Sequence, residues 1–383
     1  MRLMLTTSVP DGAHLGRDVW KGANVKTPWL RAGATISPRY REAMLTSGLQ
    51  SIYVEDEFSR GIQIREPVRE DIRRKAAETV DSALTGMRGA VVAKDHSFHN
   101  GFVNNMAAVA MMLAREIEMR ADDAGLAFGD LADADAYTFQ HSVDVATLGM
   151  VIGHRLFTKR GWVDVNGRRR MDKVDDRLMR LGLGLLLHDI GKLTIPEKVL
   201  NKPGRLTDEE WELMKKHPMA GVEMLANTNV SPLVSVVVRA HHERWDGLGY
   251  PDGRTHEAIH QFARIAAVAD VFDAITSERP YKPAAPNSVG VRVIREGRGT
   301  HFDPECVDMF LEVVAPFPPG TEVQLSDGRR GVVVEVTEGA MDRPVVRLFP
   351  EPGAAQGAPE EIDLLDHPEL TVGEVANAES IPV

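Results

Sequence analysis

A histidine and an aspartate stand side by side at the end of a strongly apolar run. The run spans residues 185–187, His188 and Asp189 follow it, and Gly191 comes soon after as a predicted helix end. Imidazole nitrogens and carboxylate oxygens are both metal ligands. A carboxylate also has two oxygens, so Asp189 can bridge two ions. The pair therefore indicates metal chemistry.

Further histidines and one more aspartate could complete such a site. Together with the pair, the candidate ligands are His141, His188, Asp189, His217, His241, His242 and Asp270. Each lone histidine could instead be a hydrogen-bonded core residue, but burying so many polar groups without a cation is costly. Ligands that are all nitrogen or oxygen suit Mn, Fe, Co, Ni or Zn. Two such ions favour in-line attack at phosphorus by a bridging hydroxide.

The ligands fall in a long region with the sequence pattern of helices. Residues 67–315 carry apolar positions at helical spacing, so the fold class is predicted to be mainly α. Residues 1–66 are expected to form a small β-rich N-terminal domain, with a strand near 31–36 and a helix over 38–46. A proline-rich boundary precedes residues 316–350, which alternate like a second small β-module. Residues 351–383, rich in Ala, Gly, Pro and Glu, are expected to be a partly disordered tail.

Composition and charge narrow the class of protein. The chain has 383 residues and a formal net charge of −11, which argues against a nucleic-acid polymer as partner, because a phosphate backbone needs a basic surface. The single cysteine, Cys306, excludes an internal disulfide and a thiolate cluster. The first residues form too short an apolar run for a signal peptide, and no membrane span is expected. We therefore expect a cytoplasmic protein.

Several longer motifs surround these ligands. In order, they are His188-Asp189-Ile190-Gly191-Lys192, His217-Pro218-Met219-Ala220-Gly221, His241-His242-Glu243-Arg244-Trp245-Asp246-Gly247-Leu248-Gly249-Tyr250-Pro251, the run from Ala269-Asp270 to Tyr281-Lys282, and Gly299-Thr300-His301-Phe302-Asp303-Pro304. This series resembles the signature of the HD-GYP phosphodiesterases over residues 137–315. The resemblance implies an all-helical HD-superfamily catalytic domain that hydrolyses cyclic di-GMP.

The resemblance also implies a role for each matching residue. One metal, with Fe or Mn expected first, would be held by His141, His188, Asp189 and Asp270, and a second by Asp189 as bridge with His217, His241 and His242. Asp189 and Lys192 would be the catalytic residues, with Lys192 beside the phosphate. The substrate-binding residues would be Lys192, Gly249, Tyr250, Pro251, Arg279 and Lys282, the last two at phosphate-binding positions.

The chemistry of cyclic di-GMP agrees with these roles. This molecule has two phosphodiester charges and two guanine faces, so Arg and Lys suit its phosphates and a tyrosine ring can stack on a base. One position departs from the family, because some members hold a third metal with a glutamate where this sequence has Tyr137. We therefore expect two metals, with linear pGpG as the main product and GMP formed more slowly.

Other functions stay open from the sequence. The domain could be a cyclic-dinucleotide sensor or protein-interaction module with little turnover, or an HD hydrolase acting on another cyclic dinucleotide. The N-terminal domain could regulate the catalytic one, form a homodimer or bind a protein partner. Near the site, Glu243 and Asp273 are candidates to orient an imidazole, and Asp246 is a candidate to order the loop.

Overall fold

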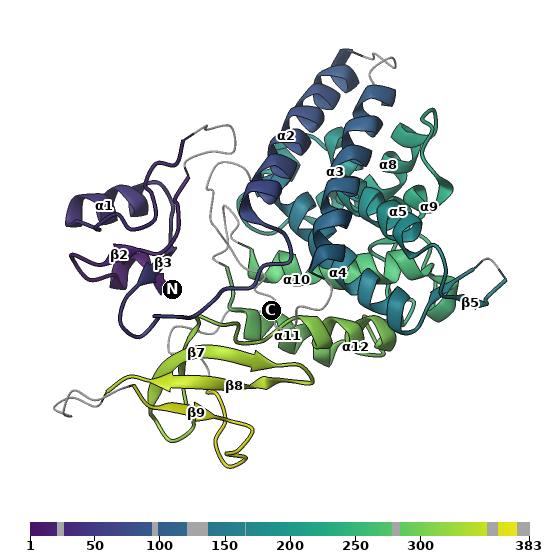
Figure 1. Ribbon diagram of the computed structural model, residues 1–383. Helices are drawn as coiled ribbons and strands as arrows, with labels where there is room; N and C mark the ends of the chain where they lie inside the picture. Colours follow the sequence, from purple (N-terminus) through teal and green to yellow (C-terminus); the bar gives the residue numbers. More distant parts are fainter. Residues whose placement is uncertain are drawn as a thin grey trace.

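The chain folds into a helical region with a small sheet-containing module at each end (Figure 1). The computed structural model describes residues 1–20, 27–93, 99–120, 137–164, 166–277, 284–350 and 359–373. The fold is mainly α, which confirms the predicted fold class. Within this described part, no helix is both long and apolar enough to cross a membrane.

The N-terminal module is a three-stranded antiparallel sheet with one helix. Its elements are β1 (Arg2–Leu5), η1 (Thr6–Ser8), β2 (His14–Leu15), α1 (Pro38–Thr46) and β3 (Ser51–Glu55), with strand order β1-β3-β2. The Ser37 hydroxyl accepts a backbone amide of the first turn of α1 and caps the predicted helix. The strand expected near residues 31–36 is reduced to an isolated bridge between His14 and Thr35. A turn at Ala32 and Gly33, where φ of Gly33 is +81°, interrupts the extended chain.

The helical region contains the candidate ligands. Its elements are α2 (Glu70–Ala93), α3 (His99–Met119), α4 (Tyr137–Lys159), β4 (Trp162–Val163), β5 (Arg169–Arg170), α5 (Val174–Leu187), η3 (Ile190–Thr194), α6 (Glu197–Leu200), α7 (Asp208–Met214), α8 (His217–Leu225), α9 (Pro232–Ala240), η4 (His256–Ala258), α10 (Gln261–Thr276), α11 (Asn287–Glu296) and α12 (Pro304–Val313). Helix α10 is buried on nearly every side, as expected of a helix that is apolar all round. It packs against α4, α9, α11 and α12, so it forms the centre of this region.

A four-stranded antiparallel sheet forms the C-terminal module. Its strands, in spatial order, are β6 (Glu322–Gln324), β7 (Arg330–Thr337), β8 (Ala340–Leu348) and β9 (Glu361–Asp363). Strand β9 lies beyond residue 350, where the sequence predicts the module to end. The polar composition of residues 351–383 did not predict this strand. In the structure a short Glu-Ile-Asp segment pairs with β8, and Leu364 and Leu370 are buried next to it. Residues 351–358 and 374–383 lie outside the described residues.

The two terminal modules contact each other. The Leu3 amide donates to the Gly320 carbonyl at 2.9 Å, and the Arg2 guanidinium lies 3.0 Å from the Glu322 carboxylate. The Arg347 guanidinium also donates to the Phe58 carbonyl at 2.8 Å. The first and last parts of the described chain therefore lie side by side, next to the helical region (Figure 1).

Candidate metal centre

The structure brings all seven candidate ligands into one cluster. They come from α4, the end of α5, the start of α8, the end of α9 and the middle of α10, in the order His141, His188 and Asp189, His217, His241 and His242, and Asp270. Five helices spread over residues 137–276 therefore converge on one point.

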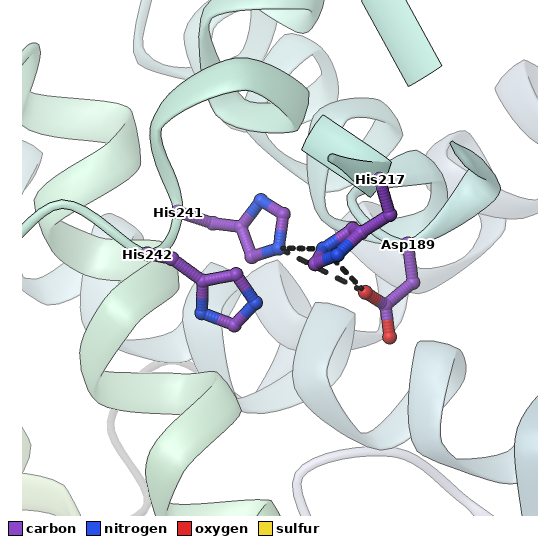
Figure 2. A group of neighbouring side chains, drawn as sticks. All are labelled: Asp189, His217, His241 and His242. Atoms are coloured by element: carbon purple, nitrogen blue, oxygen red, sulfur yellow. Dashed lines mark hydrogen bonds and ion pairs between the residues drawn. The ribbon is translucent and has the colours of Figure 1, made fainter. Parts of the chain in front are cut away.

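The ligands form two groups that share Asp189. One group is Asp189, His217, His241 and His242, and the other is His141, His188 and Asp270. Asp189 Oδ1 lies 3.4 Å from His217 Nε2, while Oδ2 lies 3.4 Å from His188 Nε2 and 3.7 Å from His141 Nε2. The two oxygens of one carboxylate thus face different groups, which is the geometry of a bridging ligand. Figure 2 shows the Asp189 carboxylate beside His217, His241 and His242.

Asp270 also reaches toward both groups. Its Oδ1 lies 3.3 Å from His141 Nε2, and its Oδ2 lies 3.8 Å from His242 Nδ1. The resemblance assigned this residue to one metal alone. In the structure its second oxygen also faces His242 of the other group.

Three imidazoles are oriented by backbone carbonyls. The Nδ1 atoms of His188, His217 and His241 lie 2.6, 2.8 and 3.1 Å from the carbonyl oxygens of Leu185, Met214 and Val238. A carbonyl oxygen only accepts, so each Nδ1 carries the proton and donates. The Nε2 atom of each ring is then an unprotonated acceptor that faces the cluster, which is the tautomer that a metal ligand requires.

With this tautomer, the Nε2 atoms of His188, His217 and His241 are all acceptors, and none of them can donate to another. His217 Nε2 and His241 Nε2 face each other at 3.2 Å, although both carry lone pairs. His188 Nε2 and Asp189 Oδ1 are buried and have no hydrogen-bond partner, an arrangement that is costly unless a cation satisfies them. Nitrogens bound to one metal at about 2.1 Å are themselves about 3.0–3.4 Å apart. The donor set and its spacing therefore fit divalent metal ions.

The charge state of the cluster also suits cations. Burial lowers the pKa of His217 and of His241, and it lowers the pKa of His242 to about 3, so these rings are neutral. Burial raises the pKa of Asp189, but Lys192 and His188 outweigh it and hold that pKa well below its usual range. The cluster thus presents an ionised Asp189 carboxylate and three neutral imidazoles, those of His217, His241 and His242.

His141 behaves differently in the absence of a cation. Burial lowers its pKa, but hydrogen bonds and charge from Asp270 and Asp273 outweigh this effect and raise it to about 10. The Asp273 carboxylate accepts from His141 Nδ1 at 2.6 Å. Asp273 therefore orients this ring, as a carboxylate often does behind a metal-binding histidine.

Lys192 lies beside the bridging carboxylate. Its ammonium is 2.5 Å from Asp189 Oδ2, and its side chain is 31% exposed. The Lys192 ammonium is thus held beside Asp189 and remains partly accessible from solvent. Gly191 does not end a helix, because α5 already ends at Leu187. Instead, a Cβ on Gly191 would lie 1.9 Å from the His217 carbonyl, so glycine permits η3 to pack against α8.

The Gly249-Tyr250-Pro251 loop lies next to the same cluster. A Cβ on Gly249 would lie 2.5 Å from the His242 carbonyl, so glycine lets the loop approach that backbone. The Tyr250 ring lies on the His242 ring, with centroids 4.7 Å apart and planes 32° apart. Burial raises the pKa of Tyr250 above its usual value, so the phenol is neutral. Pro251 follows directly and is half-buried.

Two carboxylates shape this loop. Asp246 accepts from the Leu248 amide at 3.0 Å, which agrees with its expected role in ordering the loop. Glu243 does not orient an imidazole, contrary to the sequence interpretation. Its buried carboxylate accepts from the amides of Asp252 and Arg254 at 2.7 and 3.0 Å, so it holds the chain just after the loop. Its place next to His242 in the sequence suggested the wrong partner, because the side chain of Glu243 points toward the loop.

Some predicted residues lie outside the described part of the structure. Arg279 and Lys282, the predicted phosphate-binding residues, fall in residues 278–283, which are not described. Tyr137 is the first residue of α4, but its side chain is not described.

One polar group near the cluster was missed in the sequence. Asp144 lies one helical turn after His141, and its carboxylate accepts from the side-chain amide of Gln140 at 2.8 Å. The Arg73 guanidinium of α2 lies 3.7 Å from it. The spacing of three residues from His141 was the available signal, since residues three apart share a helix face.

Comparisons with known proteins agree with the geometry. A family model described as HD domain matches residues 158–306. A cyclic di-GMP phosphodiesterase of Pseudomonas aeruginosa is 40% identical over 232 residues, which are 60% of this chain and 52% of that protein. A cyclic di-GMP phosphodiesterase response regulator of Xanthomonas campestris is 49% identical over 127 residues, 33% of this chain and 34% of that protein. A 3′3′-cGAMP-specific phosphodiesterase of Vibrio cholerae is 30% identical over 317 residues, 79% of this chain and 62% of that protein.

These similarities cover parts of the proteins concerned. The chain spans 52% of the Pseudomonas relative and 34% of the Xanthomonas relative. The matched HD domain contains every candidate ligand except His141, which precedes it on α4. Residues 158–306 therefore match an HD domain, and the chain is similar to proteins named as cyclic dinucleotide phosphodiesterases.

Proposed function

We propose that this chain is a metal-dependent phosphodiesterase that hydrolyses cyclic di-GMP. The single observation that carries the proposal is the cluster of seven nitrogen and oxygen ligands in two groups that share Asp189. The names of the Pseudomonas and Xanthomonas relatives, both cyclic di-GMP phosphodiesterases, support the same substrate.

Two divalent ions would occupy the two groups. His141, His188 and Asp270 would hold one ion, His217, His241 and His242 the other, and Asp189 would bridge them. Nitrogen and oxygen ligands suit Fe or Mn, and also Zn, Ni or Co. When bound, such a pair supplies positive charge at the phosphate and activates water for attack at phosphorus.

The residues of the chain would bind and orient the substrate around this pair. The Lys192 ammonium, partly exposed beside Asp189, would attract a phosphate oxygen and offset the charge that develops on it. The Tyr250 ring lies over His242, where it could support a nucleobase next to the scissile phosphate. Gly249 and Pro251 would set the path of that loop, and Arg279 and Lys282 are proposed as phosphate contacts.

We expect linear pGpG as the main product, with GMP formed more slowly. A second cut requires the linear dinucleotide to bind again with its other phosphodiester in place. The sequence has Tyr137 where some members of the family hold a third metal with a glutamate, and a neutral phenol is a poor ligand for these ions.

Another cyclic dinucleotide, 3′3′-cGAMP, is an alternative substrate. The 3′3′-cGAMP-specific relative matches 79% of this chain, whereas the Pseudomonas cyclic di-GMP phosphodiesterase matches 60% of it. The two molecules differ in one purine base, so the same metal chemistry serves both. A sensor with little turnover is the remaining alternative.

A product assay tests the proposal. The protein would be loaded with Mn or Fe(II) under reducing conditions, its metal content measured, and cyclic di-GMP and 3′3′-cGAMP supplied in parallel, with products separated by chromatography. The proposal predicts about two metals per chain, and hydrolysis of cyclic di-GMP to pGpG that is faster than hydrolysis of 3′3′-cGAMP. Faster cleavage of 3′3′-cGAMP than of cyclic di-GMP would show that 3′3′-cGAMP is the preferred substrate. Binding of either dinucleotide without cleavage would indicate a sensor.

A further inference from the structure

An exposed aromatic side chain lies just outside the candidate metal centre. Trp211, on α7, is 46% exposed, which is unusual for so large an apolar side chain. Its ring centroid lies 6.1 Å from that of Tyr250, with the planes at 81°. The Tyr250 ring in turn lies on the His242 ring at 4.7 Å. Three aromatic rings thus lead from the metal ligands to the surface.

Helix α7 holds Trp211 in a fixed place relative to the cluster. A capping box at Thr207 and Glu210 fixes the start of the helix, and the Lys202 ammonium lies 2.5 Å from the Glu210 carboxylate. At its other end, the Met214 carbonyl accepts from Nδ1 of the ligand His217. The indole is therefore placed by the same helix that orients a metal ligand.

The rings lie on the accessible side of the cluster. Most ligands are buried, but the His242 side chain is 24% exposed and the Lys192 side chain is 31% exposed. A substrate that reaches the cluster from solvent therefore meets His242 and the Tyr250 ring that covers it. Among the described residues, Trp211 is the next aromatic ring outward from Tyr250, at a distance where a base bound beside Tyr250 would contact the indole.

We propose that Trp211 binds a nucleobase of the cyclic dinucleotide by stacking, and so sets the affinity for purine-containing diesters. This inference rests on the proposed function, because it assigns a second base contact to the same substrate. A cyclic dinucleotide has two bases, and Tyr250 alone provides one ring face. A flat indole accepts any purine, so Trp211 would favour dinucleotides over small diesters without selecting between guanine and adenine.

The test uses two substitutions of Trp211 and one control. Trp211→Ala removes the ring, and Trp211→Phe keeps an aromatic face. Met171→Ala is the control, because Met171 is also exposed, at 57%, and follows the β4–β5 hairpin. The Mn-loaded full chain is assayed by calorimetry for binding of a phosphorothioate analogue of cyclic di-GMP, which keeps both bases and resists hydrolysis. KM and kcat are measured with Mn, and glycerol 1,2-cyclic phosphate serves as a small aliphatic diester with no ring that could stack on the indole.

Trp211→Ala is expected to weaken cyclic di-GMP binding and raise KM by about 5- to 150-fold, the effect of losing one stacked base. Trp211→Phe should recover most of this loss, and Met171→Ala should behave like the wild type. Hydrolysis of the small diester and the metal content should be unchanged in all variants, because these do not involve the indole.

The outcomes separate this inference from the proposed function. Unchanged Kd and KM in Trp211→Ala would overturn the inference, and so would an equal loss on both diesters, because that would show that the indole only positions the Tyr250 loop. Tight binding of cyclic di-GMP without turnover by the wild type would refute the phosphodiesterase proposal, while the ratio of Kd values would still decide the role of Trp211. No binding by the wild type would overturn both.

Discussion

At the scale of single residues, the cluster is organised by the atoms behind the ligands. Each of three imidazoles donates its Nδ1 proton to a carbonyl three residues earlier, as His188 does to Leu185. His141 instead donates to the Asp273 carboxylate. These partners fix which nitrogen faces the cluster before any ion arrives, so binding a metal requires little rearrangement of the rings.

Removing the carboxylate behind His141 should weaken metal binding. Asp273→Asn keeps the shape of the side chain but removes the charge that accepts from His141 Nδ1 at 2.6 Å. We expect the affinity for Mn to fall by about 10- to 100-fold, the usual effect of losing such a partner, with the change confined to one of two ions. Titration calorimetry measures it. Asp308→Asn is the control, because Asp308 pairs with Arg298 on the surface. Equal affinities in both variants would contradict the role of Asp273.

Metal binding should release a proton from His141. Its pKa of about 10 without a metal means that this imidazole is protonated at neutral pH, whereas His217, His241 and His242 have lowered pKa values and are already neutral. A metal binds the neutral ring, so about one proton should leave per chain at pH 7.5, and the affinity should rise with pH up to about 10. Calorimetry in buffers of different ionisation enthalpy counts the proton. Release of none from the wild type would disprove this protonation state.

At the scale of elements, the ends of helices place most of the ligands. His188 and His241 directly follow the last residues of α5 and α9 as their C-caps, and His217 follows the last turn of α7. The last carbonyls of a helix have no partner within the helix, and here three of them accept from these imidazoles. Helix C-termini also carry partial negative charge. Three of them directed at the cluster add to its attraction for cations.

A histidine cap on the central helix should make stability depend on pH. Nδ1 of His260 accepts from the Phe262 amide at 3.1 Å and caps α10. Burial, together with Arg264 and Arg177, lowers the pKa of His260 from 6.5 to about 4. The neutral ring is therefore favoured in the folded state, and its contribution is complete above pH 6.5 and lost as the pH falls toward 4. This loss amounts to about 3 kcal/mol.

Urea unfolding at pH 7 and pH 4.5 measures this dependence. His260→Asn is the matched variant, because asparagine caps a helix without titrating in this range. Its free energy of unfolding should fall less than that of the wild type between the two pH values. The same decrease in both proteins would mean that His260 is not the group responsible.

The sequence predicted which residues gather in the cluster better than it predicted their surroundings. The adjacent pairs His188-Asp189 and His241-His242 stand out at the ends of apolar helices, and the family motifs order the rest. The hydrogen-bond partners of Glu243 could not be predicted from the sequence, because the sequence does not show in which direction its side chain points. Strand β9 was missed because three residues in a polar, Gly- and Pro-rich segment give too little alternation to detect.

At the scale of the whole molecule, the two terminal modules are joined to each other as well as to the helices. Strand β1 and strand β6 lie together through the Leu3–Gly320 hydrogen bond and the Arg2–Glu322 ion pair. The N-terminal module also contacts the helical region, since the Arg17 guanidinium lies 2.7 Å from the Glu70 carboxylate of α2. A change in either module can therefore reach the helices that carry the cluster.

A substitution at the contact between the modules should destabilise the protein. Gly320 has φ of +87°, and a Cβ there would lie 2.7 Å from the Ile64 side chain and 3.1 Å from the Met1 carbonyl. Gly328 has φ of +91° with nothing within 4 Å of its Cβ position, so it is a matched control. Both alanine variants share the left-handed strain of about 1–2 kcal/mol, and Gly320→Ala should lose about 1 kcal/mol more through overpacking. Urea unfolding compares them, and equal losses would show that the contact tolerates the methyl group.

The central claim is that Asp189 bridges two metal ions within one cluster. Crystals of the full chain loaded with Mn, measured by anomalous diffraction, test it most directly. We predict two peaks about 3.5–4 Å apart, one beside His141 and His188 and the other beside His217 and His241, with one Asp189 oxygen on each. A single peak, or two peaks that do not share Asp189, would contradict the claim.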